Sequence, residues 1–267
     1  MKKLIILAAL LIFPVNFSFA AVSVVGELSR EKTASPGDKF EGVIFLRNNE
    51  EETFQAKVYK TDYLFSADGT NKYAEPGSTS RSNAGWISLK PAQLSIPAHD
   101  TGAVYYSVEV PKDPGLSGSY WSMLMVESIP AKSLESLKKN SPKNNALFQT
   151  AFRYGVQIVT EITGTGKSGI KFGEKKLISQ GGRKFLQFDV ENTGEKWLRP
   201  SVWLELYNKE GKSIGRFEGR RMRIYPGCSV RQEIDLEGIP KGDYKGLLVV
   251  DNGGQDVFGA EYSLGIK

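Results

Sequence analysis

The sequence predicts an all-β protein built from two tandem immunoglobulin-like β-sandwich domains, preceded by a cleaved signal peptide. Three observations support this class. Apolar and polar residues alternate with a period of two in short runs, turn residues separate the runs, and one set of landmarks occurs twice along the chain. Alternation of this period is typical of strands that bury one face, and the repeated landmarks indicate two copies of one architecture.

The repeated landmarks are an asparagine turn and a tyrosine at the start of a later strand. Asn48 ends a strand in the first copy and Asn192 does so in the second. Tyr120 and Tyr244 each follow a glycine by two positions, where the hydroxyl of a tyrosine corner can bond to upstream backbone. The first copy is longer by about 20 residues, and we place this insert in the polar stretch 66–85.

Residues 1–20 have the parts of a secretory signal peptide. Two lysines make a positive start, the apolar core 4–13 is too short to span a bilayer, and a small-x-small cleavage site ends at Ala20. The position directly after this site is not a cysteine, so an acylated lipoprotein is not expected. No later apolar run approaches the roughly 20 residues of a membrane helix, so we expect a secreted chain without a transmembrane segment.

The first domain is predicted to span residues 21–163. Alternation and turn residues place its strands at 21–30, 40–47, 54–63, 86–89, 93–96, 104–110, 120–127 and 148–162. The insert 66–85 is expected to form a long hairpin or an irregular loop. The stretch 129–145 is rich in lysine and asparagine, which is typical of a solvated loop.

Residues 164–169 are predicted to be a hinge, and residues 170–267 a second domain of about seven short strands. The hinge contains glycine, lysine and serine, as phosphate-binding loops do. However, it lacks the GxxxxGK[ST] spacing and no helical pattern follows it, so the sequence does not indicate a nucleotide site.

Catalytic and metal-binding chemistry is not predicted. The chain contains one histidine, His99, in a turn, and one cysteine, Cys228, just before a strand, so neither a Ser-His-Asp site nor a His/Cys metal cluster is supported. We expect a non-enzyme without cofactor or metal. Calcium bound by oxygens of the loop 251–256 is a less favoured alternative.

The charge is mildly positive. The formal net charge of +5 falls to +3 when Lys2 and Lys3 leave with the signal peptide, which is too small to indicate nucleic-acid binding. Arg221 and Arg223 share strand parity and are a candidate basic surface for anionic envelope polymers. The alternative is a solvated sheet face of unpaired arginines.

Several short motifs in residues 21–162 resemble the first domain of periplasmic pilus-assembly chaperones of the PapD type. They are AVSV at position 21, the asparagine pair at 48–49, ESIP at 127–130 and ALFQTAFRYGV at 146–156, in the order that this family shows. The resemblance implies two immunoglobulin-like domains around a cleft. It also implies binding of an unfolded subunit by strand addition, with basic residues that bind the subunit's terminal carboxylate.

The resemblance also implies site residues. Arg153 falls where the family has its carboxylate-binding lysine, and Arg30 is its candidate partner on the first strand. Phe148 and Phe152 would contribute apolar contacts from the last strand. Asn144 and Ala146 precede them at positions that the family fills with large apolar side chains.

The resemblance therefore predicts a periplasmic, non-catalytic chaperone that binds a secreted or pilin-like subunit during pilus or fimbrial assembly. The alternative is a structural or adhesive immunoglobulin-like module of the cell envelope. In that case the insert 66–85 and the two arginines at 221 and 223 would be contact surfaces. The residues do not indicate an oligomeric state.

Overall fold

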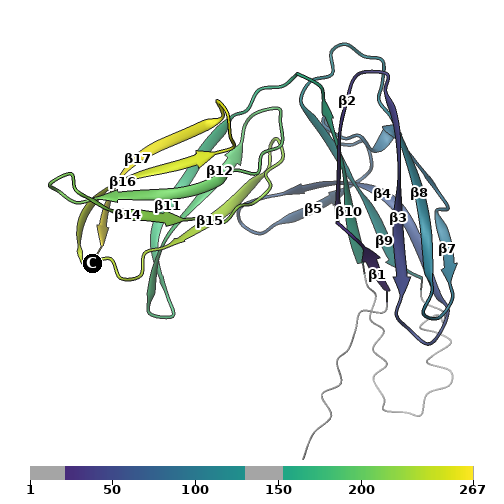
Figure 1. Cartoon of the computed structure of the whole chain (residues 1–267), viewed down its shortest axis with the longest axis horizontal. Coiled ribbons are helices and arrows are strands. Elements are labelled where there is room, and N and C mark those ends of the chain that lie inside the picture. Colours follow the sequence, from purple (N-terminus) through teal and green to yellow (C-terminus); the bar gives the residue numbers. More distant parts are fainter. Residues whose placement is uncertain (1–21, 130–152, 267) are drawn as a thin grey trace, which may run out of the picture.

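The computed structural model describes residues 22–129 and 153–266. The predicted signal peptide, the 129–145 loop beyond its first residue, and Phe148 and Phe152 lie outside these ranges. The described chain forms two β-sandwiches that follow one another, which confirms the predicted fold class (Figure 1).

The first sandwich is built from ten strands and one short 3-10 helix within the described residues. In chain order these are β1 (Val22–Val25), β2 (Ser29–Ala34), β3 (Lys39–Asn48), β4 (Phe54–Phe65), β5 (Asn71–Ala74), η1 (Ala84–Trp86), β6 (Ile87–Lys90), β7 (Gln93–Ile96), β8 (Thr101–Glu109), β9 (Ser119–Ser128) and β10 (Arg153–Ile162).

These strands form two sheets. One has the order β1-β3-β8-β6, and the other β2-β10-β9-β4-β5, with β7 also paired to β4. The alternating residues turn their apolar side chains inward, so that Ile44, Val104, Leu124 and Ile158 meet in one core with almost no exposed surface. This burial is the main stabilising term of the domain.

The second sandwich has the predicted seven strands. They are β11 (Ile170–Gln180), β12 (Arg183–Asn192), β13 (Ser201–Tyr207), β14 (Ser213–Glu218), β15 (Ser229–Asp235), β16 (Gly242–Asp251) and β17 (Val257–Ile266). Their sheets have the orders β11-β12-β15 and β14-β13-β16-β17, around a core that contains Phe188, Leu204 and Leu248.

The repeated landmarks have equivalent structural roles. Asn48 and Asn192 are both fully buried, and each side chain donates to main-chain carbonyls and accepts from an amide two residues ahead. The Tyr244 hydroxyl donates to the carbonyl of Pro240 at 2.8 Å, as a tyrosine corner does. In the first sandwich the Tyr120 hydroxyl instead accepts from the amide of Ser117, at 3.5 Å.

The insert 66–85 begins as the predicted hairpin. β4 is two residues longer than expected, reaching Phe65, and pairs with β5 beyond a tight turn. The rest of the insert is held by Asp62, whose carboxylate accepts from the amides of Gly77 and Thr79 and from the hydroxyl of Ser82. Figure 1 shows the hairpin extending from the first sandwich towards the second.

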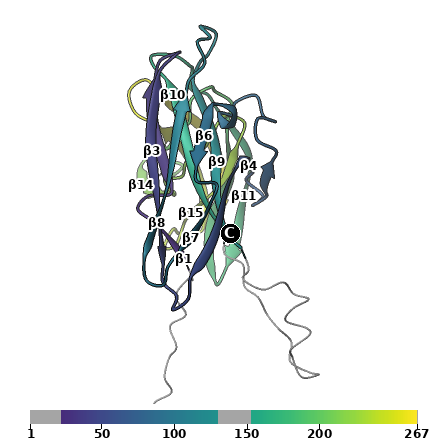
Figure 2. The same ribbon diagram turned by 90° about the vertical axis from the view of Figure 1, so that its right-hand side faces the viewer.

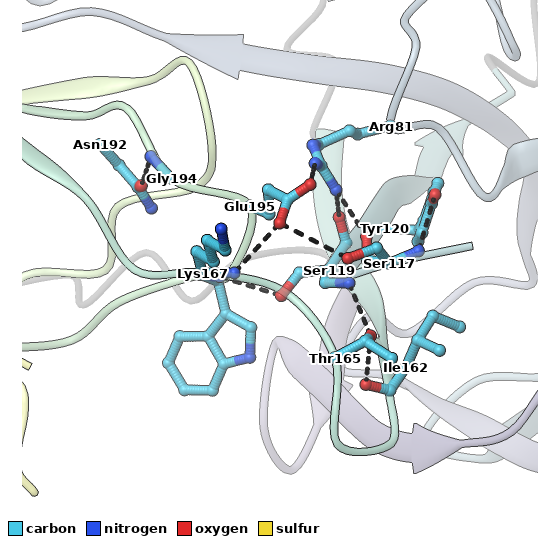
Figure 3. Close-up of polar contacts among 12 residues, drawn as sticks. Arg81, Ser117, Ser119, Tyr120, Ile162, Thr165, Lys167, Asn192, Gly194 and Glu195 are labelled. Atoms are coloured by element: carbon cyan, nitrogen blue, oxygen red, sulfur yellow. Dashed lines mark hydrogen bonds and ion pairs between the residues drawn. The ribbon is translucent and has the colours of Figure 1, made fainter. Parts of the chain in front are cut away.

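The two sandwiches meet through specific contacts. The Ser119 amide donates to the Glu195 carbonyl at 2.8 Å, and Arg81 lies 3.5 Å from the Glu195 carboxylate (Figure 3). Trp121 of the first sandwich stacks on Tyr225 of the second, with ring centroids 4.6 Å apart and planes at 6°. Figures 1 and 2 together show the sandwiches side by side at an angle, joined at one end.

Candidate functional site

The edge of β10 is the candidate site. On one side β10 pairs with β9 from Arg153 to Glu161, whereas on the other side β2 pairs only with Gln157–Ile162. No described strand pairs with this second side at residues 153–156. The first four residues of β10 therefore have an open edge.

The open edge presents backbone hydrogen-bonding groups. The amide of Gln157 donates towards β2, to the Leu28 carbonyl at 2.8 Å. Because successive residues of a strand direct these groups to opposite sides, the N–H and C=O groups of Arg153 and Gly155 point the same way. Within residues 22–129 and 153–266 these groups have no strand partner, and such edge groups can accept an added strand.

The edge is open because the first strand of the domain changes sheets. β1 pairs with β3 in one sheet and β2 pairs with β10 in the other, so the chain crosses between them at residues 26–28. Gly26 has φ of +89°, a conformation that other residues rarely adopt. Sequence alternation predicted one strand at 21–30 and did not reveal this division. The crossing leaves Val25 and Leu28 almost half exposed, at 47% and 48%.

Arg30 lies at the closed end of this edge. It is opposite Ile158 in the register of β2 and β10, and it is partly buried. Its guanidinium packs close to Gly26, within 3.4 Å of the position that a Cβ there would occupy. Burial raises the pKa of the nearby Tyr106, and the charge of Arg30 partly opposes this rise. Among the described residues, Arg30 forms no ion pair.

Arg153 lies at the other end, in a cluster of charges. Its Nη2 atom is 3.3 Å from Oε2 of Glu127, which also accepts from the Tyr59 hydroxyl at 2.8 Å and lies 3.5 Å from Nζ of Lys57. Burial alone would raise the pKa of Glu127. The hydrogen bond from Tyr59 and the two cations outweigh this effect and hold the pKa below its ordinary value. Two cations against one carboxylate leave the cluster with one net positive charge.

The structure does not bring Arg30 and Arg153 together. Arg30 is opposite Ile158 in the strand register, and Ile158 lies five positions along β10 from Arg153. At about 3.3 Å per residue, the separation of the two backbone positions along the strand is roughly 16 Å. They lie instead at opposite ends of the open edge.

The candidate basic surface of Arg221 and Arg223 requires a correction. Residues 219–223 do not form a strand, so parity does not place the two side chains on one face. The Arg223 side chain is directed to the first sandwich, where it pairs with Glu31 and Ser29. Its guanidinium also lies over the ring of Trp197, which belongs to the second sandwich. Arg221 stays exposed and donates to the Arg199 carbonyl. The two arginines therefore do not form a shared surface.

A pocket of about 540 Å³ lies where the β4–β5 hairpin meets the second sandwich. Phe65, Gln157, Arg223 and Tyr225 are among the residues that line it. The Tyr225 hydroxyl donates to Gln157, and burial raises the pKa of Tyr225 to about 12. These side chains are already paired across the junction, which indicates that they join the sandwiches.

The single histidine and the single cysteine lie in surroundings that indicate structural roles. His99 is exposed in a turn, with Nε2 3.0 Å from Glu51. Cys228 is fully buried, and burial raises the pKa of its thiol to about 11. Within residues 22–129 and 153–266, no group of three or more His, Cys, Asp or Glu side chains is placed to hold a metal ion. In those ranges no helix has the length and apolar character needed to cross a membrane.

Sequence reasoning missed the residues that define the edge and the junction. Leu28 lies near the end of the predicted first strand and Glu31 directly after it, and Trp121 alternates like any core residue. Gly26, which follows Val24 and Val25 in the predicted strand, is a local signal for the crossing between sheets, because an isolated glycine in a strand marks a bend or bulge.

Comparison with known proteins gives structural neighbours only. No family model matches the chain, and no curated protein matches its sequence. Solved structures do match, and many of them are fimbrial or pilus chaperones of the PapD-like type.

Three of these neighbours illustrate the similarity. The class 5 fimbriae chaperone CfaA is 10% identical, with a TM-score of 0.49, over 90% of this chain and 98% of that one. The YadV chaperone is 13% identical, with a TM-score of 0.44, over 92% and 100%. A chain of the CsuC–CsuE chaperone–tip adhesion subunit pre-assembly complex of Acinetobacter baumannii is 14% identical, with a TM-score of 0.43, over 91% and 98%. At these identities the similarity concerns the fold.

Proposed function

We propose that this protein is an exported, non-catalytic chaperone that binds a secreted or pilin-like subunit by strand addition at the open edge of β10. The observation that carries the proposal is the unpaired edge at Arg153–Val156, beside a strand that pairs normally with β9. A partner strand there would gain main-chain hydrogen bonds from Arg153 and Gly155, which is the basis of affinity in strand addition.

The surroundings of the edge suit an extended apolar chain. Leu28 is exposed at the crossing between the sheets and would contact an apolar side chain of the added strand. The added strand must end near Gln157, because β2 occupies the edge from there onwards. This limit makes a chain terminus a suitable ligand.

The two arginines distinguish the orientations of the added strand. A strand parallel to β10 would place its terminal carboxylate at Arg30, whereas an antiparallel strand would place it near Arg153. We favour the parallel orientation, because β2 extends the same edge in parallel and Arg30 has no ion pair among the described residues. The proposed location is the periplasm, from the predicted signal peptide and the resemblance to pilus chaperones.

The first experiment tests the backbone edge. The mature chain, residues 21–267, would be crosslinked and co-purified from its own exported compartment as wild type, Arg153→Ala and Arg153→Pro. Both variants lose the guanidinium, but only proline also loses the N–H that faces the open edge. We expect capture of one discrete partner to fall about fivefold further in Arg153→Pro than in Arg153→Ala, the effect of about one hydrogen bond.

The second experiment tests carboxylate binding. A fluorescent peptide that reproduces the last residues of the captured partner would be titrated with a free carboxylate and as the amide. We expect wild type to prefer the free carboxylate and Arg30→Gln to lose that preference, while Arg153→Gln retains it. Loss in Arg153→Gln alone would establish the antiparallel orientation.

Equal capture by the alanine and proline variants would contradict strand addition. Recovery of envelope polymer alone, with no discrete protein partner, would favour the structural or adhesive module instead. Circular dichroism of each variant would show whether the fold is retained.

A further inference from the structure

The outer face of the β1-β3-β8-β6 sheet carries an exposed apolar cluster. Strand register places Val25, Phe45 and Ala103 in one row across three strands, and Val43 beside Tyr105 in the next row. Val25, Phe45 and Tyr105 are 47%, 43% and 62% exposed. Figure 1 shows β3 and β8 on the side of the first sandwich that faces away from the second, so the junction does not cover this cluster.

Two opposite charges flank the cluster on β3. Glu41 and Arg47 share the outward parity of Val43 and Phe45, so from residue 41 to residue 47 the outer face of β3 reads acidic, apolar, apolar, basic, and Lys39 precedes this run at the start of the strand. The side chains of Glu41 and Arg47 are exposed. Among the described residues neither forms an ion pair, and Arg47 only donates weakly to the Thr101 hydroxyl at 3.4 Å.

This order of charges is complementary to itself when reversed. We infer that the face binds a second copy of this chain, about a twofold axis that crosses the strands at the level of Ile44. The axis would place Glu41 of each copy against Arg47 of the other, and Val43 against Phe45. A twofold interface uses the same patch on both copies, so each complementary pair forms twice. The two sheets would stack about 10 Å apart, as in a sandwich.

The size of the face indicates a weak dimer. β3 and β8 have ten and nine residues, and β1 and β6 have four each, so at about 3.3 Å per residue and 4.8 Å per strand the face covers roughly 430 Å². Each copy would bury on the order of 400 Å², which is below the standard size of specific interfaces and in the range of weak, transient ones. Dissociation is therefore expected in the micromolar range.

A charge-exchange experiment tests the inference. The dissociation constant of mature residues 21–267 would be measured by sedimentation equilibrium for wild type, Glu41→Arg, Arg47→Glu and the double variant. Each single substitution places like charges opposite one another twice, so we expect at least tenfold weaker dimerisation. The double variant exchanges the charges and should return to within about threefold of wild type. An equimolar mixture of the two single variants should also dimerise, because each then complements the other.

A matched pair of variants tests the apolar contact. Phe45→Lys should abolish dimerisation, whereas Val257→Lys should leave it unchanged, because Val257 is similarly exposed at 52% but lies on the second sandwich. Circular dichroism would confirm that each variant is folded.

Four results would overturn the inference. A wild-type chain that stays monomeric up to millimolar concentration would exclude the dimer. Charge variants that dimerise as well as wild type would exclude this face. Dimerisation that is lost in Arg153→Pro but unchanged in Phe45→Lys would also exclude it. A monomer that binds another protein through Phe45 would assign the face to that protein.

Discussion

At the scale of single residues, Asn48 and Asn192 each donate to several main-chain carbonyls from a buried side chain. Nδ2 of Asn48 donates to three carbonyls, of Glu52, Ile96 and Pro97, at 2.8 to 3.0 Å. Nδ2 of Asn192 donates to two carbonyls, at 2.7 and 2.8 Å. Two of these carbonyls, of Pro97 and Ile224, also accept from main-chain amides, of Asp100 and Leu198. For the other three the asparagine is the hydrogen-bond donor that the described residues show outside the strand ladders. The asparagine side chains therefore stabilise equivalent turns in the two sandwiches.

We expect Asn48→Ala and Asn192→Ala each to lower the free energy of unfolding by about 2–4 kcal/mol, because buried carbonyls would lose their donors. Asn48→Asp should also destabilise the protein, since it keeps the acceptor oxygen but loses the donor. Urea unfolding followed by tryptophan fluorescence would measure the changes. A loss below about 0.5 kcal/mol, typical of surface substitutions, would contradict this role.

At the scale of elements, the insert after β4 is an ordered part of the first sandwich. The β4–β5 hairpin reaches the second sandwich, where the Ala67 amide donates to the Ser229 hydroxyl at 2.9 Å. The following residues fold around Asp62, which is fully buried. Burial alone would raise the pKa of Asp62, but donors that include the Ser82 hydroxyl and the Thr79 and Gly77 amides outweigh it and lower the pKa. The charged form of Asp62 is therefore the stabilising one.

This shift predicts a contribution to acid stability. A carboxyl whose folded pKa is below its ordinary value of 3.8 stabilises the fold fully above that value, and the contribution is lost as pH falls through the folded pKa. We expect Asp62→Asn to destabilise the protein at pH 7 and to reduce the loss of stability below about pH 4. Urea unfolding at several pH values would measure both effects, and a parallel pH profile in wild type and variant would contradict the prediction.

At the scale of the whole molecule, the two sandwiches are joined by an extensive junction. Trp121 and Val159 of the first sandwich belong to the same buried cluster as Tyr225 of the second. The segment between the sandwiches is also bonded on both sides. The Thr165 hydroxyl accepts from the Gly118 amide at 2.9 Å, and the Lys167 carbonyl accepts from the Glu195 amide at 2.7 Å (Figure 3). These contacts favour one relative orientation over a freely moving hinge.

We expect Tyr225→Ala to uncouple the sandwiches at a cost of about 3–5 kcal/mol, the range for removing a buried aromatic ring. Calorimetry should then resolve two unfolding transitions, and small-angle scattering should give a larger radius of gyration. Tyr225→Phe keeps the stack on Trp121 and loses only the bond to Gln157, so it should cost about 1 kcal/mol. Unchanged scattering and a single transition in Tyr225→Ala would contradict a rigid junction.

The sequence by itself determined the fold class, the internal repeat and the seven strands of the second sandwich. It also identified Asn48 and Asn192 as equivalent structural positions and Tyr244 as a tyrosine corner. These features follow from local rules, because side-chain alternation, turn chemistry and tyrosine corners are set by residues close together in the chain.

Only the tertiary structure decided the open edge, the separation of Arg30 from Arg153 and the pairing of Arg223 with Glu31. Each depends on which distant strands pair and in what register. Alternation gives the face that a residue occupies but does not specify its cross-strand neighbour. The first strand could therefore be predicted as a strand, whereas its crossing from one sheet to the other, which exposes the edge of β10, is a property of the assembled sandwich.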